Sequence, residues 1–369
     1  MPQSNTFNYE FRIKFNGDFM YTNNKTKKVK AGNIYIGGDA PVSVQSMLCV
    51  PAHDINGNVE QAKRLESAGC DIVRVTVPDK EAIKTVEALK KNIKIPLVAD
   101  IHFDYRLAIE SVAAGIDKVR INPGNIGDED KVKLVADTCR KAGVPIRIGV
   151  NSGSLEKSIL EKYGSATPEA MVESGLYHIS LLEKYDFTDI VLSLKSSDTF
   201  RMYKAYELAA QKCPYPLHLG VTEAGTENMG VIKSAAGIGG LLLRGIGNTI
   251  RISLTDDPQK EVEAGIKLLK AIGLRQEGVR LVSCPTCGRT EIDLIGIAKE
   301  AEKRLSAVNK NITVAIMGCV VNGPGEASAA DIGIAGGKQC GVIFKKGEII
   351  KKLPENQLLD ALMDEIEKM

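Results

Sequence analysis

The sequence predicts an α/β protein, a (β/α)₈ TIM barrel followed by a small C-terminal α/β domain. From residue 41 onwards, eight short runs rich in aliphatic residues alternate with stretches of helical pattern. Eight such strand–helix units are the repeat of a TIM barrel. At 369 residues the chain is long enough for one large domain and one small domain. After residue 272 the eightfold alternation stops and a cluster of cysteines begins.

The composition is that of an ordinary globular protein. Hydrophobic residues make up 44% and charged residues 25%, and the net charge is only +2. This balance gives no reason to expect a nucleic-acid or membrane partner. No apolar run of about 18 residues and no apolar signal core is present. We therefore expect a cytoplasmic protein, in which the eight cysteines are metal ligands or buried thiols rather than disulfides.

Residues 1–38 are predicted to be an N-terminal β-extension that plugs or edges the barrel. Aromatic and aliphatic residues alternate with polar ones between Phe7 and Phe15, which is a strand period. Val29–Ala31 and Ile34–Ile36 flank Gly32 and Asn33, a pattern typical of a tight hairpin.

Residues 39–272 are predicted to form the barrel. The expected strands are Val42–Met47, Ile72–Val77, Ile95–Asp100, Lys118–Asn122, Ile146–Val150, Ile190–Lys195, Leu217–Thr222 and Thr249–Leu254. Expected helices include Asn58–Ala68, Lys80–Lys91, Glu129–Ala142, Pro168–Lys184 and Gln259–Ile272. Glycines that follow alanine at 69, 115 and 143 fit helix C-caps placed just before the next strand.

Alternate residues of a barrel strand face the surrounding helices and the lumen. One alternate set is entirely apolar and is assigned to the helix side: Val73, Val75, Leu97, Ala99, Val119, Ile121, Ile146, Ile148, Ile190, Leu192, Leu194, Leu217, Leu219, Val221, Ile250, Ile252 and Leu254. The other set is polar and is assigned to the lumen: Gln45, Arg74, Thr76, Asp100, His102, Arg120, Asn122, Arg147, Asn151, Ser193, Lys195, His218, Thr222, Arg251 and Ser253. Barrel lumens are ordinarily filled by branched aliphatic side chains, so this lumen is predicted to be a binding site.

The lumen set carries an excess of positive charge. Its five permanent cations are Arg74, Arg120, Arg147, Lys195 and Arg251, and the nearby carboxylates are Asp100 and Glu223. Ion pairs could use some of the cations, but unpaired buried charge is costly, so a bound anion is favoured. The number of cations suggests more than one phosphate group. The glycine-rich stretch 237–240 follows the seventh strand, where barrel phosphate loops are often found.

Residues 273–279 are predicted to be a linker and residues 280–369 a small α/β domain. Its expected elements are strands Val279–Ser283, Thr313–Met317, Ile332–Ala335 and Val342–Lys345 and helices Glu291–Ala307 and Glu355–Lys368.

Three cysteines of this domain form a candidate metal site. Cys284 and Cys287 make a CxxC pair, and Cys319 opens a glycine- and proline-rich loop. Thiolates in this arrangement bind zinc or an iron–sulfur cluster, and spacing alone does not choose between them. Glu326 or Cys340 could be the fourth ligand. The remaining cysteines are interpreted as core or surface thiols: Cys49, Cys70, Cys139 and Cys213.

Long motifs along the chain resemble one enzyme family. They are PVSVQSM (41–47), VRINPGN (119–125), IRIGVNSGS (146–154), GVTEAG (220–225), CPTCGR (284–289) and GCVVNGPGE (318–326). The chain from about residue 26 to its end resembles the bacterial 4-hydroxy-3-methylbut-2-en-1-yl diphosphate synthases of the non-mevalonate isoprenoid pathway, whereas residues 1–25 do not match. The resemblance implies a TIM barrel with a [4Fe–4S] domain whose cluster ligands are Cys284, Cys287, Cys319 and Glu326.

The resemblance also implies an activity and its site. The family's substrate is 2-C-methyl-D-erythritol 2,4-cyclodiphosphate, which is opened by a two-electron reduction with loss of a hydroxyl as water, with flavodoxin or ferredoxin as the reductant. The residues expected to bind it are Arg74, Arg120, Arg147, Asn151, Ser193, Lys195, Arg251 and Ser253. Glu223 is the first candidate for the proton source, Asp100 and His102 would orient the substrate or relay protons, and Glu326 would be an exchangeable ligand.

A homodimer is expected from the length of the linker. The last barrel helix runs back towards the N-terminal face, and seven residues span at most about 25 Å. The cysteine domain of one chain is therefore expected to cap the barrel of its partner. Two other functions remain open from the residues alone, a non-redox barrel enzyme with a structural zinc and a non-enzymatic sensor of a phosphorylated ligand.

Overall fold

A computed structural model describes residues 26–319, 329–338 and 340–369, which form two compact units divided between Leu274 and Arg275. Each unit is described by itself. The strand expected between Phe7 and Phe15 and the expected cluster ligand Glu326 lie outside the described residues.

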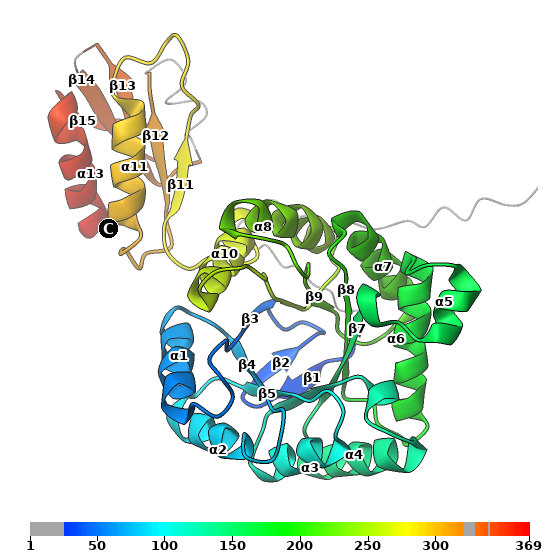
Figure 1. Ribbon diagram of the computed structural model, residues 1–369. Helices are drawn as coiled ribbons and strands as arrows, with labels where there is room; N and C mark the ends of the chain where they lie inside the picture. Colours follow the sequence, from blue (N-terminus) through cyan, green and yellow to red (C-terminus); the bar gives the residue numbers. More distant parts are fainter. Residues whose placement is uncertain (1–25, 320–328, 339) are drawn as a thin grey trace, which may run out of the picture. The chain divides into compact units, whose positions relative to one another are not determined.

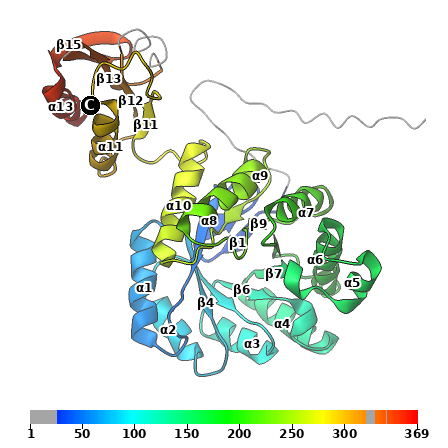
Figure 2. The same cartoon turned by 45° about the horizontal axis from the view of Figure 1, so that its top comes forward.

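The first unit is a closed parallel barrel surrounded by helices (Figures 1 and 2). Its strands are β3 (Ser43–Met47), β4 (Ile72–Thr76), β5 (Leu97–Asp100), β6 (Lys118–Ile121), β7 (Ile146–Asn151), β8 (Ile190–Lys195), β9 (His218–Leu219) and β10 (Thr249–Ile250). They pair in the order β8-β7-β6-β5-β4-β3-β10-β9. A parallel bridge between Leu192 of β8 and Leu217, the residue directly before β9, closes the ring. The predicted fold class is confirmed.

The helices follow the strands in the expected alternation. They are α1 (Ile55–Ser67), α2 (Ile83–Asn92), α3 (Tyr105–Ala113), α4 (Glu129–Ala142), α5 (Lys157–Tyr163), α6 (Pro168–Glu183), α7 (Thr199–Lys212), α8 (Glu227–Ser234), α9 (Gly240–Leu242) and α10 (Pro258–Ala271). Short 3₁₀ turns η1 (Pro123–Asn125) and η2 (Ser152–Ser154) follow β6 and β7. Side chains of Asp54, Asp104, Asp128 and Asp198 cap helix N-termini, which satisfies backbone N–H groups that lack a helical partner.

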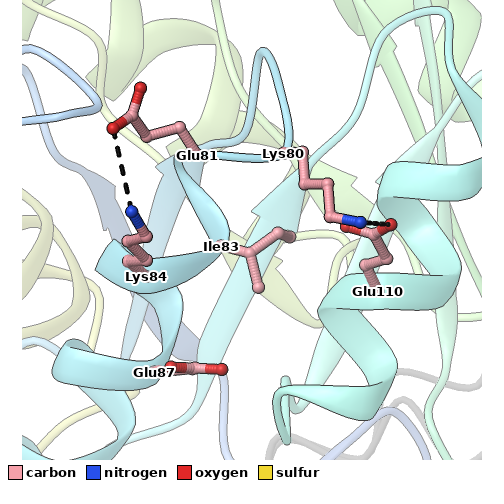
Figure 3. Close-up of a pocket in the computed structure, with 6 residues that line it drawn as sticks. All are labelled: Lys80, Glu81, Ile83, Lys84, Glu87 and Glu110. Atoms are coloured by element: carbon pink, nitrogen blue, oxygen red, sulfur yellow. Dashed lines mark ion pairs between the residues drawn. The ribbon is translucent and has the colours of Figure 1, made fainter.

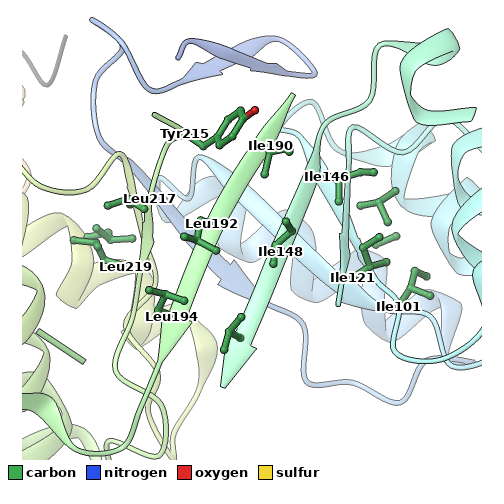
Figure 4. Packing of buried hydrophobic residues seen from close by; sticks show 14 of the residues in the cluster. Ile101, Ile121, Ile146, Ile148, Ile190, Leu192, Leu194, Tyr215, Leu217 and Leu219 are labelled. Atoms are coloured by element: carbon green, nitrogen blue, oxygen red, sulfur yellow. The ribbon is translucent and has the colours of Figure 1, made fainter. Parts of the chain in front are cut away.

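The apolar strand residues assigned to the helix side form one buried core (Figure 4). Ile146, Ile148, Ile190 and Leu192 are each 0% exposed. Only Leu254 of the assigned set is partly buried. Because side chains alternate along a strand, burying this set under the helices turns the polar set into the lumen.

A hairpin closes the N-terminal end of the lumen. β1 (Val29–Ala31) pairs with β2 (Ile34–Ile36) in antiparallel register. Its buried side chains pack on Ile72, Val98 and Val191, which are apolar lumen-facing residues of β4, β5 and β8. The lumen is therefore apolar beside the hairpin, and its polar residues lie further along the strands.

The second unit is a five-stranded sheet covered by two helices. Its strands are β11 (Arg280–Ser283), β12 (Thr313–Met317), β13 (Ile332–Gly337), β14 (Cys340–Lys345) and β15 (Glu348–Pro354), in that spatial order. The first three are parallel, and β14 and β15 are antiparallel to their neighbours. The helices α11 (Leu294–Leu305) and α13 (Leu358–Glu367), the latter preceded by the 3₁₀ turn η4 (Glu355–Gln357), share one core with the sheet. β15 was not predicted, because its sequence, with two adjacent isoleucines followed by two lysines, does not alternate between apolar and polar residues.

Two details of the barrel differ from the sequence prediction. β9 and β10 are each two residues long, so Thr222, Arg251 and Ser253 lie beyond the strands. The prediction of a phosphate-binding loop at 237–240 is wrong. These residues continue the helix α8 through the π-helical turn η3 (Ala235–Gly239) into α9. A Cβ on Gly237 would stand 2.5 Å from Met202 Cε and 2.9 Å from Thr199 Cγ2, both on α7, so this glycine allows close helix packing.

Candidate active site

Asp100, at the carboxyl end of β5, is the centre of the lumen's charged network. Its Oδ1 accepts a hydrogen bond of 3.2 Å from Arg120 on β6, and its Oδ2 lies 3.8 Å from Arg74 Nε on β4. His102 Nε2 lies 3.4 Å from the same Oδ2. The Asp100 side chain is 4% exposed, whereas that of His102 is 53% exposed. One buried carboxylate thus pairs with the guanidinium groups of Arg74 and Arg120, and the imidazole of His102 lies on the solvent-exposed side of this network.

The charges around Asp100 control its protonation. Burial by itself would raise the pKa of Asp100, but the charge of Arg74, a hydrogen bond from His102 and the charges of Arg120 and Arg147 lower it well below its usual range. Burial, together with repulsion from Arg251 and Arg120, lowers the pKa of Arg74 to about 10 despite the attraction of Asp100. Asp100 is therefore ionised at any physiological pH.

Arg251 has a carboxylate partner that the sequence analysis did not count. Its Nε and one terminal nitrogen lie 3.3 Å from the two oxygens of Glu261 on α10. Glu261 is 3% exposed and also accepts a hydrogen bond from the Leu254 amide at 3.0 Å. Periodicity did not identify this pair, because Glu261 has the sequence position of an ordinary acidic residue in the first turn of a helix.

Arg147 and Lys195 lack such partners. Arg147, on β7, is 1% exposed, and its Nε and one terminal nitrogen have no hydrogen-bond partner. Lys195, at the end of β8, is 7% exposed and makes no ion pair with any residue in the described ranges. Burial, and then the charges of Arg251 and Arg74, lower the pKa of Lys195 well below its ordinary value. Neither side chain has a carboxylate at ion-pair distance among the described residues, although the charge of Asp100 offsets part of the burial of Arg147.

A sixth cation, Lys118, lies deeper in the lumen and was missed. It stands two residues before Arg120 on β6, so both face the same side, and that spacing could have identified it. Lys118 is 0% exposed, and its Nζ lies 3.5 Å from Gln45 Oε1 of β3 across the barrel. His218 on β9 is also fully buried, and both of its ring nitrogens lack partners. Burial and the charges of Arg147 and Lys195 lower the pKa of His218 well below its usual value.

The neutral residues predicted for the site lie beside these cations. Asn151 stands opposite Lys195 in the register of β7 and β8 and is half-buried. Ser193 is fully buried, and its hydroxyl has no partner. Ser253 is half-buried, two residues after Arg251. No hydrogen bond joins these three side chains to the cations within the part of the chain that the structure describes.

Glu223 is set apart from the charged network. It is exposed, and no ion pair joins it to another described residue. Its φ of +52° lies in the left-handed region, which costs energy for a residue other than glycine and is often found at functional sites. The carboxylate expected to neutralise lumen cations is thus Glu261 rather than Glu223.

With Lys118 added to the cations and Glu261 in place of Glu223, six lumen cations face two buried carboxylates. The cations are Arg74, Lys118, Arg120, Arg147, Lys195 and Arg251, and the carboxylates are Asp100 and Glu261. The excess of positive charge predicted from the sequence therefore remains. Arginine forks and an ammonium group at the carboxyl ends of parallel strands form an anion site of the kind that binds phosphate oxygens.

A surface pocket on the outer helices has no comparable chemistry (Figure 3). Its volume is about 430 Å³, and it is lined by residues of α2, the loop before it and α3. Lys80 pairs with Glu110 at 3.3 Å, and Lys84 pairs with Glu81 at 3.8 Å. Its charges are thus largely matched, unlike those of the lumen.

The second unit places its cysteines at one edge of the sheet. Cys284 directly follows β11, and Gly318 and Cys319 directly follow β12, which is parallel to β11 and paired with it. The Gly318 amide donates a hydrogen bond of 3.2 Å to Cys284 Sγ. Cys340 begins β14 opposite Gly337, the last residue of β13, so it lies at the same edge.

Two of the predicted thiol ligands, Cys284 and Cys287, have contacts that favour a thiolate. Cys284 already accepts a backbone hydrogen bond, as a thiolate does. Cys287 is exposed, and hydrogen bonds from the backbone and side chain of Arg289 lower its pKa. A lowered thiol pKa favours the ligating form. Among the described residues, no group of three or more candidate ligands is close enough together to hold a metal ion.

Fold and lumen together define a TIM-barrel protein with a strongly cationic interior and a separate cysteine-bearing domain. The family model of the GcpE TIM-barrel domain matches residues 26–266, and that of the GcpE protein C-terminal domain matches residues 280–368. The chain belongs to this family, which confirms the resemblance drawn from the motifs.

Curated relatives match along nearly the whole chain. The protein of Caldanaerobacter subterraneus subsp. tengcongensis is 60% identical over 93% of this chain and 97% of its own length. The protein of Clostridium tetani is 58% identical over 94% of this chain and 99% of its own length, and that of Geobacter sulfurreducens is 54% identical over 94% and 98%. All three are named 4-hydroxy-3-methylbut-2-en-1-yl diphosphate synthase (flavodoxin).

A membrane span is not found: none of the helices in the described ranges is long and apolar enough to form one.

Proposed function

We propose that this chain is a 4-hydroxy-3-methylbut-2-en-1-yl diphosphate synthase. It converts 2-C-methyl-D-erythritol 2,4-cyclodiphosphate into 4-hydroxy-3-methylbut-2-enyl diphosphate in the non-mevalonate isoprenoid pathway. Two electrons enter, one ring bond between carbon and a diphosphate oxygen breaks, and the neighbouring hydroxyl leaves as water with one added proton. A carbon–carbon double bond forms in the product.

The observation that carries the proposal is the uncompensated positive charge of the lumen. Arg147 and Lys195 are buried without a carboxylate partner, and a cyclic diphosphate would supply the missing negative charge. Arg74, Arg120 and Arg251 would complete the clamp, since their forks reach the same region from three strand ends. Asn151, Ser193 and Ser253 would serve as neutral donors to diphosphate and hydroxyl oxygens.

The main role of Asp100 is to position two arginine side chains. It fixes the guanidinium groups of Arg74 and Arg120 before the substrate arrives, which avoids ordering them on binding. Because its pKa is far below neutrality, it does not donate the proton that removes the hydroxyl. His102, exposed at the entrance, and Glu223 remain as proton donors, and we assign the first role to Glu223 because its backbone is held in a left-handed conformation.

The thiolates of Cys284, Cys287 and Cys319, with the carboxylate of Glu326, would hold a [4Fe–4S] cluster. Such a cluster supplies single electrons and an iron that can bind a substrate oxygen. A carboxylate fourth ligand exchanges more readily than a thiolate, which favours Glu326 over Cys340 for that position. Flavodoxin is the expected electron donor because the relatives' names include it, and ferredoxin is the alternative. Both donors would place the reaction in the cytoplasm.

A homodimer completes the proposal. α10 ends at Ala271 and β11 begins at Arg280, so few residues join the barrel to the cysteine domain. The cysteine domain of one chain would then deliver electrons to the barrel of its partner.

The test is anaerobic purification followed by an absorption spectrum, iron and sulfide analysis, and an assay with the cyclodiphosphate and reduced flavodoxin. We expect broad absorbance near ~400 nm, about four irons per chain and formation of the linear diphosphate. A colourless protein that contains one zinc, cannot be reconstituted with iron and sulfide and leaves the cyclodiphosphate intact would refute the proposal.

A further inference from the structure

Two loops at the carboxyl ends of neighbouring strands meet on one buried histidine. The loop after β6 runs from Asn122 into the turn η1, and the loop after β7 runs from Asn151 through η2 to Glu156. Both asparagines belong to the lumen set. His178, on α6, is 0% exposed and contacts both loops.

The contact with the first loop is made through a glycine. A Cβ on Gly124 would stand 2.7 Å from Cε1 of the His178 ring, so the turn rests directly on the imidazole. The Gly124 amide donates a hydrogen bond of 3.1 Å to Asn122 Oδ1. That bond uses the oxygen of the Asn122 amide and leaves its NH₂ group as the free donor.

The contact with the second loop is a hydrogen bond between side chains. His178 Nε2 lies 2.5 Å from Glu156 Oε1, and Glu156 stands at the N-cap of α5. The other ring nitrogen, Nδ1, is buried without a partner. A residue needed only to fill space would be apolar here, since a buried polar atom without a partner is costly. The bond to Glu156 gives the imidazole a role that an apolar side chain could not fill.

We propose that His178 is a positioning residue that fixes the two asparagine-bearing loops relative to each other, through its ring against Gly124 and its bond to Glu156. Among the described residues, neither His178 nor Glu156 pairs with a lumen cation, since the ion pair that each makes is with the other. Both would therefore act through Asn122 and Asn151. The inference rests on the proposed function, because the ligand whose affinity depends on these loops is the cyclic diphosphate.

A double-mutant cycle tests the contact with Gly124. The φ of Gly124 lies outside the left-handed region, so Gly124→Ala strains only the contact with the ring. His178→Ala removes the atom that the new methyl group would meet. We expect Gly124→Ala to lower the urea midpoint and raise KM in the wild type, and to do so much less in the His178→Ala background. Gly153→Ala in the second loop is the matched control, because a Cβ there meets nothing within 4 Å.

A conservative variant separates positioning from packing. His178→Ala should raise KM for the cyclodiphosphate by about tenfold while kcat changes less than about threefold, since displaced loops weaken binding. His178→Gln can still donate a hydrogen bond to Glu156, and it should restore most of the lost KM. A fall in urea midpoint with KM unchanged in every variant would overturn the proposal, as would additive effects in the cycle.

Failure of the proposed function can be recognised separately. If the wild type does not convert the cyclodiphosphate, that function fails, and the same variants are then measured for the Kd of inorganic pyrophosphate. An increase in that Kd with His178→Ala, reversed by His178→Gln, would still support the positioning role. An unchanged Kd would refute it.

Discussion

At the scale of single residues, Arg147 shows how binding and stability conflict. It is buried without a carboxylate partner, and burial followed by the charges of Arg74 and Arg120 lowers its pKa well below the ordinary value. We expect Arg147→Met to increase the free energy of unfolding of the ligand-free protein by about 1–2 kcal/mol, because it removes a buried charge that has no ion-pair partner. The same variant should raise KM by at least about tenfold.

Urea denaturation measures the free energy of unfolding and steady-state kinetics measures KM, both on the same preparation of Arg147→Met. Lys133→Met, on the exposed surface of α4, is the control, and it should change neither quantity appreciably. A loss of stability in Arg147→Met would mean that the guanidinium has a compensating partner in the ligand-free protein.

Asp100 has the opposite role, since its carboxylate compensates two guanidinium groups. Asp100→Asn should lower the free energy of unfolding by about 3 kcal/mol at neutral pH, because Arg74 and Arg120 lose their buried partner. The pKa of Asp100 is lower in the folded protein than in the unfolded chain. Its contribution is therefore fully present above about pH 4 and declines as the pH falls below that value.

Urea midpoints between pH 3 and pH 7 test this behaviour. The wild type should lose more stability than Asp100→Asn as the pH falls below about 4. Glu129→Gln, which breaks an exposed pair with Lys184, serves as the comparison and should cost at most about 1 kcal/mol. Parallel pH curves for the wild type and Asp100→Asn would contradict the assignment.

At the scale of elements, the N-terminal hairpin supports the barrel. Ile36 is 0% exposed and packs on the lumen residues Ile72, Val98 and Val191. Ile36→Ala should lower the free energy of unfolding by about 2–4 kcal/mol through lost burial and a cavity. The neighbouring Tyr35 is 47% exposed, and Tyr35→Ala should cost less than about 1 kcal/mol. Chemical denaturation measures the free energy of unfolding of both variants. Equal losses of that free energy would mean that the buried face of the hairpin does not stabilise the barrel.

The cysteine edge of the second sheet provides another test at this scale. Cys319 follows β12, and Cys340 begins β14. We expect Cys319→Ser to lose most of its iron, since a ligand is removed, and Cys340→Ser to keep it. Glu326→Ala should reduce turnover more than iron content, because an exchangeable ligand matters during the reaction. Iron and sulfide analysis beside the assay distinguishes these outcomes, and iron loss in Cys340→Ser would make that thiol the fourth ligand.

At the scale of the whole molecule, the proposed dimer can be tested by complementation. Arg120→Met inactivates the barrel, and Cys319→Ser inactivates the cysteine domain. If each domain serves the partner's barrel, a mixed dimer has one complete site. An equal mixture that exchanges subunits should then recover about a quarter of wild-type activity. The double variant mixed with itself is the control, and no recovery despite exchange would favour a site within one chain.

Much of the fold followed from local patterns. Period-two alternation with an apolar set on one side identified the strands and the helix side of the barrel, because burial of one strand face acts on every second residue. β9 and β10 ended earlier than predicted, and residues 237–240 proved helical. Gly237 in that stretch packs closely on Met202 and Thr199 of another helix, which a local pattern does not reveal.

The sequence by itself determined that polar side chains line the lumen, that cations outnumber carboxylates there, and that Cys284, Cys287 and Cys319 belong to one small domain. Only the tertiary structure decided that Glu261 rather than Glu223 neutralises Arg251 and that His178 joins two loops. The physical reason is that strand alternation is fixed by neighbours in the chain, whereas ion pairs and ring contacts depend on which distant elements the closed barrel brings together.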